Sequence, residues 1–405
     1  MLQCRQCLAF LVPALASPLR EIYENPVRNN PRDVQMSGID NLQGMKLGRR
    51  GLLQTLGVAA IGISFGGLAA CSKSESSGKV STGEEPKLNF YNWDTYIGET
   101  TLADFKTASG VDVKMDLFDS NDVLFAKFKA GNPGYDVIVP SNDFVERMAK
   151  AGMLMPLDHA QIPNLKNVDP TFIDVAYDKG RKHSMPYTWL SLGIGYRKSK
   201  VKVRPDSWKV LFDSAEYSGR IALLSEAGDL FRLYGKYLGK SVNGLTAADI
   251  KTIEAMLIKQ KPHIKKFHSD DGQDLLAKGD VDLVLEYNGD IAQLMQEDDD
   301  IDFVIPKEGS QLNSDNLCIP AGAKHPGNAH AFINNLLDAQ VGKKITETIL
   351  YPTPNAAAKA LMPDDYKNNP VIFPAADVLA KCEYAAFNPE LQPLYEEAMT
   401  RVNAA

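Results

Sequence analysis

Short apolar runs that end in turn residues alternate along this chain with segments whose apolar residues recur three and four positions apart. The runs predict buried strands at residues 88–93, 111–118, 135–140, 192–196, 221–224, 281–287 and 301–306. The other segments predict amphipathic helices at residues 101–108, 123–130, 144–151, 250–259 and 342–350. Because strand and helix alternate, we expect an α/β fold with largely parallel sheets. A chain of 405 residues has the length for two domains.

A second pattern, at residues 45–71, predicts export. It has a positive head, a mildly apolar run and a final Leu-Ala-Ala-Cys sequence, in the order of a secretory signal peptide. The last four residues resemble a lipobox, so residues 45–70 are predicted to be a lipoprotein signal peptide and Cys71 the lipidated residue. The apolar run is too short and too rich in glycine for a transmembrane helix. The pair Arg49-Arg50 also resembles part of a twin-arginine motif, which leaves the export route open.

Residues 1–44 fit no part of such a signal peptide, and we interpret them as a mis-assigned upstream extension before a start at Met45. Cys4 and Cys7 form a C-x-x-C pair in this extension, but no second pair with zinc-ligand spacing accompanies it. Residues 71–86 are rich in Ser, Gly, Lys and Glu and lack an apolar period, so they are predicted to be a flexible tether.

The charge of the exported part argues against nucleic acid as a partner. Residues 1–70 carry seven Lys/Arg and four Asp/Glu, so 37 basic and 47 acidic residues remain, a formal net charge of −10. This balance disfavours nucleic-acid binding and is compatible with a cationic ligand. Beyond the signal peptide and Cys71, the only cysteines are Cys318 and Cys382, which could form a disulfide or stay free in an oxidising compartment.

No pattern predicts catalysis, a cofactor or a metal. His268, Ser269 and Asp270 are triad residue types, but adjacent residues point in divergent directions and cannot form a relay. The six histidines lack paired ligand spacing, and the chain contains no Gly-rich phosphate loop. The acidic run at residues 297–300 is interpreted as a solvated loop, with metal binding as the alternative. The chain is therefore predicted not to be an enzyme.

Aromatic and acidic residues, together with one serine, instead collect where predicted strands end, the edge that faces the crevice of an open α/β sheet. These residues are Trp93, Tyr96, Ser141, Asp143, Glu226, Asp229, Tyr287, Asp290 and Asp315. An aromatic ring can attract an ammonium group with about 0.5–2 kcal/mol. For each acid taken singly, a solvated loop is the alternative. A role in the core remains open for Tyr96, and an N-cap role for residues 141–143.

At these residues the chain resembles the spermidine/putrescine-binding proteins of the type II periplasmic binding fold, from about Leu88 to the C-terminus. The resemblance is carried by Tyr91-Asn92-Trp93, Tyr135-Asp136 through Pro140-Ser141, Met185-Pro186-Tyr187 with Trp189, Phe267-His268-Ser269, Pro306-Lys307-Glu308-Gly309 and Tyr351-Pro352-Thr353-Pro354-Asn355. It implies two lobes with a ligand cleft between them, lobe 1 at residues 87–191 and 312–359 and lobe 2 at residues 195–309 and 362–405.

The resemblance also implies roles for single residues: aromatic walls for Trp93 and Tyr96, a polar contact for Ser141, and amine-holding acids. The full implied ligand set is Trp93, Tyr96, Ser141, Asp143, Glu226, Asp229, Tyr287, Asp290, Asn313, Asp315 and Tyr351. Tyr287 stands where the family usually has a tryptophan. Asn313 stands at the place of a second large aromatic residue, so the ring is missing there.

The implied function is the capture of putrescine or spermidine and its delivery to an ABC permease of the inner membrane. The expected protein is a periplasmic monomer, held to the membrane by its lipid anchor only. Three alternatives stay open: the same fold with another cationic solute, such as an amino acid or peptide; a lipoprotein enzyme that uses Ser141; and a sensory binding protein.

Overall fold

The computed structural model describes residues 83–405. The predicted signal peptide, Cys71, most of the predicted tether and the Cys4/Cys7 pair lie outside the described residues. In the described part, no helix combines the length and the apolar character needed to cross a bilayer.

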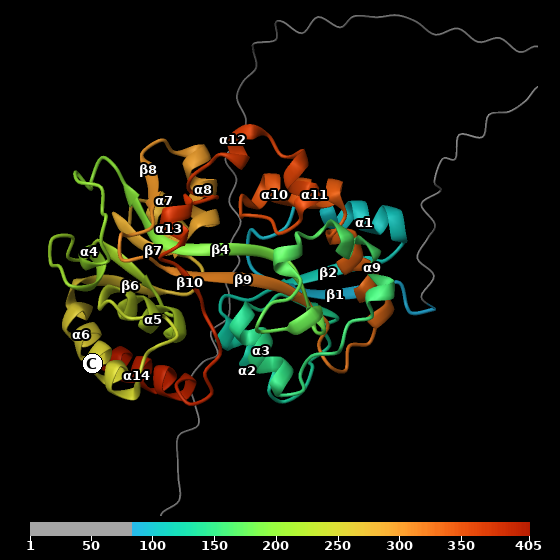
Figure 1. Ribbon diagram of the computed structural model, residues 1–405, viewed down its shortest axis with the longest axis horizontal. Coiled ribbons are helices and arrows are strands. Elements are labelled where there is room, and N and C mark those ends of the chain that lie inside the picture. Colours follow the sequence, from blue (N-terminus) through green and yellow to red (C-terminus); the bar gives the residue numbers. More distant parts are fainter. Residues whose placement is uncertain (1–82) are drawn as a thin grey trace, which may run out of the picture. The chain divides into compact units, whose positions relative to one another are not determined.

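The strands of residues 83–405 form one connected sheet (Figure 1). They are β1 (Lys87–Asn92), β2 (Asp112–Leu117), β3 (Val137–Ile138), β4 (Ser184–Arg197), β5 (Ile221–Leu224), β6 (Ile264–His268), β7 (Leu283–Tyr287), β8 (Ile301–Val304), β9 (Gln311–Cys318) and β10 (Glu383–Tyr384). Their order is β2-β1-β3-β9-β4-β7-β5-β6, with β10 paired to β9 and β8 paired to β4. All seven predicted strands are present, although Val137–Ile138 is shorter than expected.

The sheet is mixed, which corrects the prediction of largely parallel sheets. At one end β1 pairs in parallel with β2 and β3, and at the other end β5 pairs in parallel with β6 and β7. In the centre β4 runs antiparallel to β9, β7 and β8, and β9 runs antiparallel to β3. The α/β class is therefore correct, but β4 pairs antiparallel with its neighbours in the centre, whereas the outer strands pair in parallel.

Strand β4 joins the two halves of the sheet, and in Figure 1 it runs beside β9 across the middle of the molecule. Its first part, Ser184–Ser191, pairs with β9, and its second part pairs with β7 and β8. At this change of partner, the backbone N–H of Ser191 donates to the Oδ1 of Asn288 at 3.0 Å. Just beyond it, a Cβ on Gly193 would lie 2.2 Å from the ring of Phe303, so the close packing requires glycine there.

The helices of residues 83–405 lie among and beside these strands. They are α1 (Thr101–Ser109), α2 (Asn121–Phe128), α3 (Asn142–Lys150), α4 (Lys209–Phe212), α5 (Ala227–Tyr237), α6 (Ala247–Gln260), α7 (Gly272–Ala277), α8 (Asn288–Glu297), α9 (Pro326–Leu336), α10 (Ala339–Ile349), α11 (Ala356–Leu361), α12 (Asp364–Lys367), α13 (Ala376–Leu379) and α14 (Gln392–Ala404). Short 3₁₀ turns add His159–Gln161, Pro163–Asn167, Pro170–Phe172, Lys179–Arg181 and Lys261–His263. Local sequence explains several starts: Thr246 and Asp249 form a capping box at α6, and Asp338 caps α10.

The structure also describes the two cysteines beyond the tether and the acidic run at residues 297–300. Cys318 is buried and Cys382 partly buried, and both are free thiols. In the acidic run, Asp298 and Asp300 pair with Arg197 at 3.1 and 3.4 Å. Across residues 83–405, no group of three or more His, Cys, Asp or Glu residues has the arrangement of a metal site.

Candidate ligand-binding site

A narrow cavity lies where strands from both halves of the sheet end. It is lined by Trp93, Asp94, Tyr96, Ser141, Leu190, Asp270, Tyr287, Asp290, Asp315 and Tyr351. Its volume of about 20 Å³ leaves room for little more than the width of a water molecule. Seven of the eleven predicted ligand residues meet here: Trp93, Tyr96, Ser141, Tyr287, Asp290, Asp315 and Tyr351.

One wall of the cavity is held by the turn that follows β1. The indole Nε1 of Trp93 donates to the carbonyl oxygen of Val139 at 2.9 Å, and its ring packs against Phe118 at 4.3 Å between centroids. The ring of Tyr96 meets that of Tyr351 edge to face at 4.9 Å. Trp93 is therefore fixed by partners outside the cavity lining, and Tyr96 and Tyr351 pack against each other within it.

Asp315, on β9, is the most firmly held carboxylate of the cavity. Its Oδ1 accepts a hydrogen bond from the hydroxyl of Ser141 at 2.7 Å, and its Oδ2 accepts one from the hydroxyl of Tyr96 at 2.8 Å. Ser141 also stands at the N-cap position of α3, but its side chain makes no capping bond. The hydroxyl thus serves the cavity, and the N-cap interpretation holds only for the backbone position.

Asp290 enters the cavity from the first turn of α8, directly after β7. It is 6% exposed, and the hydroxyl of Tyr351 bonds to it. The neighbouring Gly289 makes this contact possible, because a Cβ there would lie 2.2 Å from the Tyr351 ring. Gly289, which by sequence alone would be assigned to a turn, therefore shapes the wall of the site.

Two acids of the cavity were missing from the predicted set. Asp94 directly follows Trp93, and Asp270 follows the end of β6. The rule that singled out other strand-end acids applies to Asp270 as well, but β6 is Ile-Lys-Lys-Phe-His and its lysines hide the strand pattern. Asp94 could have been found from its place beside Trp93.

Burial and mutual repulsion raise the pKa values of Asp270, Asp290 and Asp315. The pKa of Asp290 rises to about 7, first because of burial and then because of the charges of Asp315 and Asp94. Burial likewise raises the pKa of Asp315 to about 6, although its hydrogen bonds to Ser141 and Tyr96 oppose the rise. For Asp270, burial and the nearby Asp290 raise the pKa to about 9. These carboxyls lack a neighbouring cation strong enough to offset the cost of their charge.

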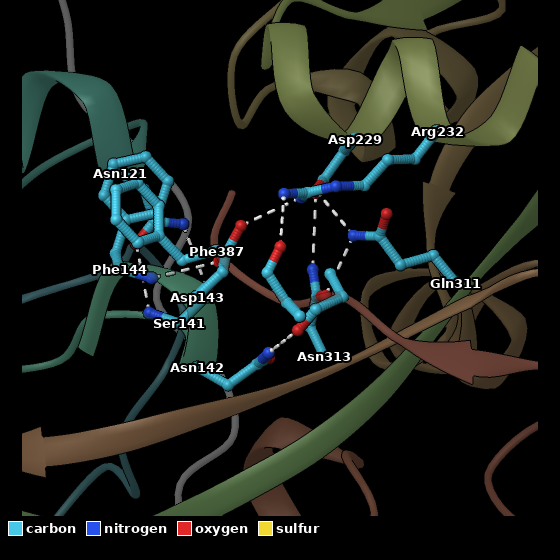
Figure 2. A network of polar contacts seen from close by, with 12 residues as sticks. Asn121, Ser141, Asn142, Asp143, Phe144, Asp229, Arg232, Gln311, Asn313 and Phe387 are labelled. Atoms are coloured by element: carbon cyan, nitrogen blue, oxygen red, sulfur yellow. Dashed lines mark hydrogen bonds and ion pairs between the residues drawn. The ribbon is translucent and has the colours of Figure 1, made fainter. Parts of the chain in front are cut away.

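The other four predicted residues do not line the cavity. Three of them, Asp143, Asp229 and Asn313, lie in a network beside it (Figure 2). The fourth is Glu226. The centre of this network is Arg232, a residue that the sequence analysis did not single out. Its Nη1 donates to the Oδ2 of Asp143 at 2.9 Å and lies 3.6 Å from the Oδ1 of Asp229. The sequence carried one hint, because Arg232 follows Asp229 by three residues and so shares its helix face.

Asn313 belongs to this network and Glu226 is held separately, and neither lines the cavity. The side-chain amide of Asn313 donates to the Oδ2 of Asp229 at 3.3 Å. Asn313, which stands where an aromatic residue was expected, therefore holds the Asp229 carboxylate in place. Glu226 is 8% exposed, and its Oε2 accepts from the backbone N–H of Asn121 at 3.2 Å. Burial, followed by the charge of Asp122, raises the pKa of Glu226 well above its usual range.

Comparisons with known proteins agree with this architecture. Residues 100–374 match the family model described as bacterial extracellular solute-binding protein. The Escherichia coli putrescine-binding periplasmic protein PotF is 35% identical over 342 residues, which cover 79% of this chain and 92% of PotF. The Haemophilus influenzae spermidine/putrescine-binding periplasmic protein 1 is 32% identical, over 84% of this chain and 95% of that protein.

A solved structure extends the comparison to three dimensions. A putative spermidine/putrescine ABC transporter from Listeria monocytogenes superposes with a TM-score of 0.75 at 32% identity, covering 79% of this chain and 99% of its own. The two-lobed fold that the sequence predicted is thus confirmed. The chain belongs to the bacterial extracellular solute-binding protein family, as a relative of periplasmic putrescine- and spermidine-binding proteins.

Proposed function

We propose that the protein captures a polyamine, putrescine or spermidine, in the cavity between its lobes and delivers it to an ABC permease. One observation carries the proposal. The cavity is lined by four aspartates and four aromatic rings, and none of its lining residues, all within the described part of the chain, is basic. The names of the relatives, which are binding proteins for putrescine and spermidine, support the same ligand class.

The chemistry of the cavity suits a ligand with two separated positive charges. Asp290 and Asp315 are buried carboxyls whose pKa values are raised to about 7 and about 6, so an empty cavity holds charge at a cost. A diammonium ligand removes this cost through charge-assisted hydrogen bonds at both ends. The methylenes between its amines would lie against the rings of Trp93 and Tyr96. Closing the lobes excludes water and strengthens each of these interactions.

The charge of the cavity lining disfavours the alternative of an amino acid. An amino acid brings an α-carboxylate, which would face aspartates without a basic partner in the lining. An unbranched diamine carries no carboxylate and avoids this conflict.

The setting of this function is part of the proposal. We place the protein in the periplasm as a monomer tethered through lipidated Cys71, with lobe 1 at residues 87–191 and 312–359 and lobe 2 at residues 195–309 and 362–405. The family consists of solute-binding transport proteins, and we propose that this member binds its ligand without converting it. A permease with two halves would contact one lobe with each half.

Titration calorimetry of the purified full chain with putrescine, spermidine, spermine and lysine tests the ligand. We expect micromolar or tighter binding of at least one polyamine and no binding of lysine. Asp290→Asn should abolish or strongly weaken the binding, because it removes a cavity charge while keeping the shape.

Asp302→Asn is the matched control. Asp302 accepts a hydrogen bond from the hydroxyl of Tyr196 at 2.7 Å, much as Asp315 does from Tyr96, but it is not among the cavity residues. Binding should be unchanged in this variant. If the wild-type protein binds none of the three polyamines, the proposed ligand is contradicted. Binding of lysine alone would favour the amino-acid alternative.

A further inference from the structure

The network beside the cavity contains its own buried cation. Arg232, on α5, is 2% exposed, and its guanidinium lies between Asp143 at the start of α3 and Asp229 on its own helix (Figure 2). The Nη1 is 2.9 Å from the Oδ2 of Asp143 and 3.6 Å from the Oδ1 of Asp229. The Nη2 donates to the carbonyl oxygen of Ala386 at 3.2 Å. An arginine keeps its charge in any protein environment, so this position is permanently cationic.

The hydrogen bonds of Asp229 are also made within the protein. Its Oδ1 accepts from the side-chain amide of Gln311 at 2.5 Å, and its Oδ2 accepts from Asn313 at 3.3 Å. The hydroxyl of Tyr287 donates to the same Oδ2 at 3.2 Å. With Arg232 beside it, this carboxylate has a full set of partners and offers no position for an ammonium group.

The cavity presents the opposite situation. Asp315 and Asp290 accept hydrogen bonds from hydroxyl groups. Within residues 83–405, the cavity lining contains no positively charged side chain that could pair with their carboxylates. Tyr287 marks the border, because its ring lines the cavity while its hydroxyl bonds to Asp229 on the other side. Acids that look equivalent in the sequence are thus divided into an unpaired set and a set that Arg232 already pairs.

We propose that Arg232 determines the length of the ligand by closing one end of the site with the protein's own positive charge. A diamine satisfies the cavity aspartates and ends before the network. The third amine of a triamine would have to approach a guanidinium of the same charge and acids that are already paired. This inference rests on the proposed function, and it narrows the ligand class to diamines with a short methylene chain.

The test compares putrescine and spermidine on the full-length wild-type chain and on Arg232→Gln, by calorimetry and by the ligand-induced shift of the melting temperature. We expect the wild type to bind putrescine at least about tenfold more tightly than spermidine, because a like charge opposite a buried charge is strongly unfavourable. In Arg232→Gln the buried Asp143 and Asp229 lose their cation and become free for a third amine. The preference should therefore fall by about tenfold or more, and the melting-temperature shift caused by spermidine should increase relative to the shift caused by putrescine.

Arg220→Gln is the control for the loss of one positive charge. Arg220 pairs with Asp282 at 2.7 Å and takes no part in the network around Arg232, so the wild-type preference should persist. If Arg232→Gln does not fold, Arg232→Gln combined with Asp143→Asn replaces it, since this pair leaves fewer buried charges without a partner.

The outcomes separate this inference from the proposed function. A wild type that binds spermidine as tightly as putrescine, or an Arg232→Gln variant that keeps the wild-type preference, overturns the role of Arg232 while the polyamine function stands. A wild type that binds neither amine overturns both.

Discussion

Replacing Asp315 by asparagine should change ligand affinity and protein stability in opposite directions. Asp315 is 4% exposed and accepts hydrogen bonds from Ser141 and Tyr96. Burial raises its pKa from 3.8 to about 6 in the ligand-free protein. The charged carboxylate is therefore useful to the ligand but costly to the empty fold.

The stability effect follows from this pKa. A rise of about two pKa units corresponds to about 3 kcal/mol, at about 1.4 kcal/mol per unit. Because the folded pKa lies above the unfolded one, the penalty is fully present above about pH 6 and vanishes below about pH 4. Asparagine carries no charge and its amide oxygen still accepts one hydroxyl. The ligand-free variant should thus gain up to about 3 kcal/mol at neutral pH, less the loss of one hydrogen bond of about 1 kcal/mol.

The affinity effect has the other sign. Removing one partner of a buried, hydrogen-bonded charge pair costs about 2–5 kcal/mol of binding free energy. At about 1.4 kcal/mol per factor of ten, Asp315→Asn should bind its polyamine about 30-fold to several thousand-fold more weakly.

Calorimetric titration and urea unfolding of the ligand-free protein measure the two effects, each at neutral pH and near pH 4. Asp302→Asn, which removes a tyrosine-bonded aspartate outside the cavity lining, should leave affinity unchanged. The reasoning is refuted if ligand-free Asp315→Asn is less stable than the wild type at neutral pH, or if its stability difference from the wild type is the same near pH 4.

Three further predictions concern pH, packing and anchoring. Since Asp290 and Asp315 have pKa values of about 7 and about 6, a polycation should expel protons on binding, and its affinity should fall at least about tenfold between about pH 8 and pH 5. Titrations in two buffers of different ionisation enthalpy measure the proton release and the affinity. Binding without proton release would contradict this prediction. Gly289→Ala places a Cβ 2.2 Å from the Tyr351 ring and should weaken binding at least about tenfold while circular dichroism stays unchanged; wild-type affinity would show that the ring moves without cost. Cys71→Ser should shift the protein from the membrane fraction to the soluble periplasm on immunoblots, and an unchanged membrane fraction would exclude lipidation at this residue.

The sequence predicted those parts of the site that follow a local rule. Trp93, Asp290 and Ser141 each stand within three residues of the end of a strand, and the structure places all three in the cavity. Strand β9 escaped prediction because its sequence, Gln-Leu-Asn-Ser-Asp-Asn-Leu-Cys, is mostly polar although every residue is buried. Its polar groups are satisfied by partners far away in the chain, such as Asn142 for the backbone N–H of Ser314, and no local pattern reveals such pairs.

The division of the acids lay beyond sequence reasoning for a related reason. Arg232 and Asp143 stand 89 positions apart and belong to different helices, so nothing near Asp143 shows that its charge is already paired. Asp229 follows a strand just as Asp290 does, yet only Asp290 reaches the cavity. An arginine that pairs with an acid can lie far from it along the chain, so the sequence does not show the pair. Whether such an arginine is present determines whether the acid is available to a ligand.

The change of partner within β4 predicts a link between ligand binding and lobe movement. Ser191 is the last residue of β4 that pairs with β9, and its N–H donates to the side chain of Asn288, the first residue of α8. Asp290 lies in the same turn of α8. A ligand that holds Asp290 therefore also steadies the acceptor of this N–H, at the position where an opening movement would bend the strand. Hydrogen exchange at the single amide of Ser191 should consequently slow when the ligand binds, which makes it a local reporter of domain closure.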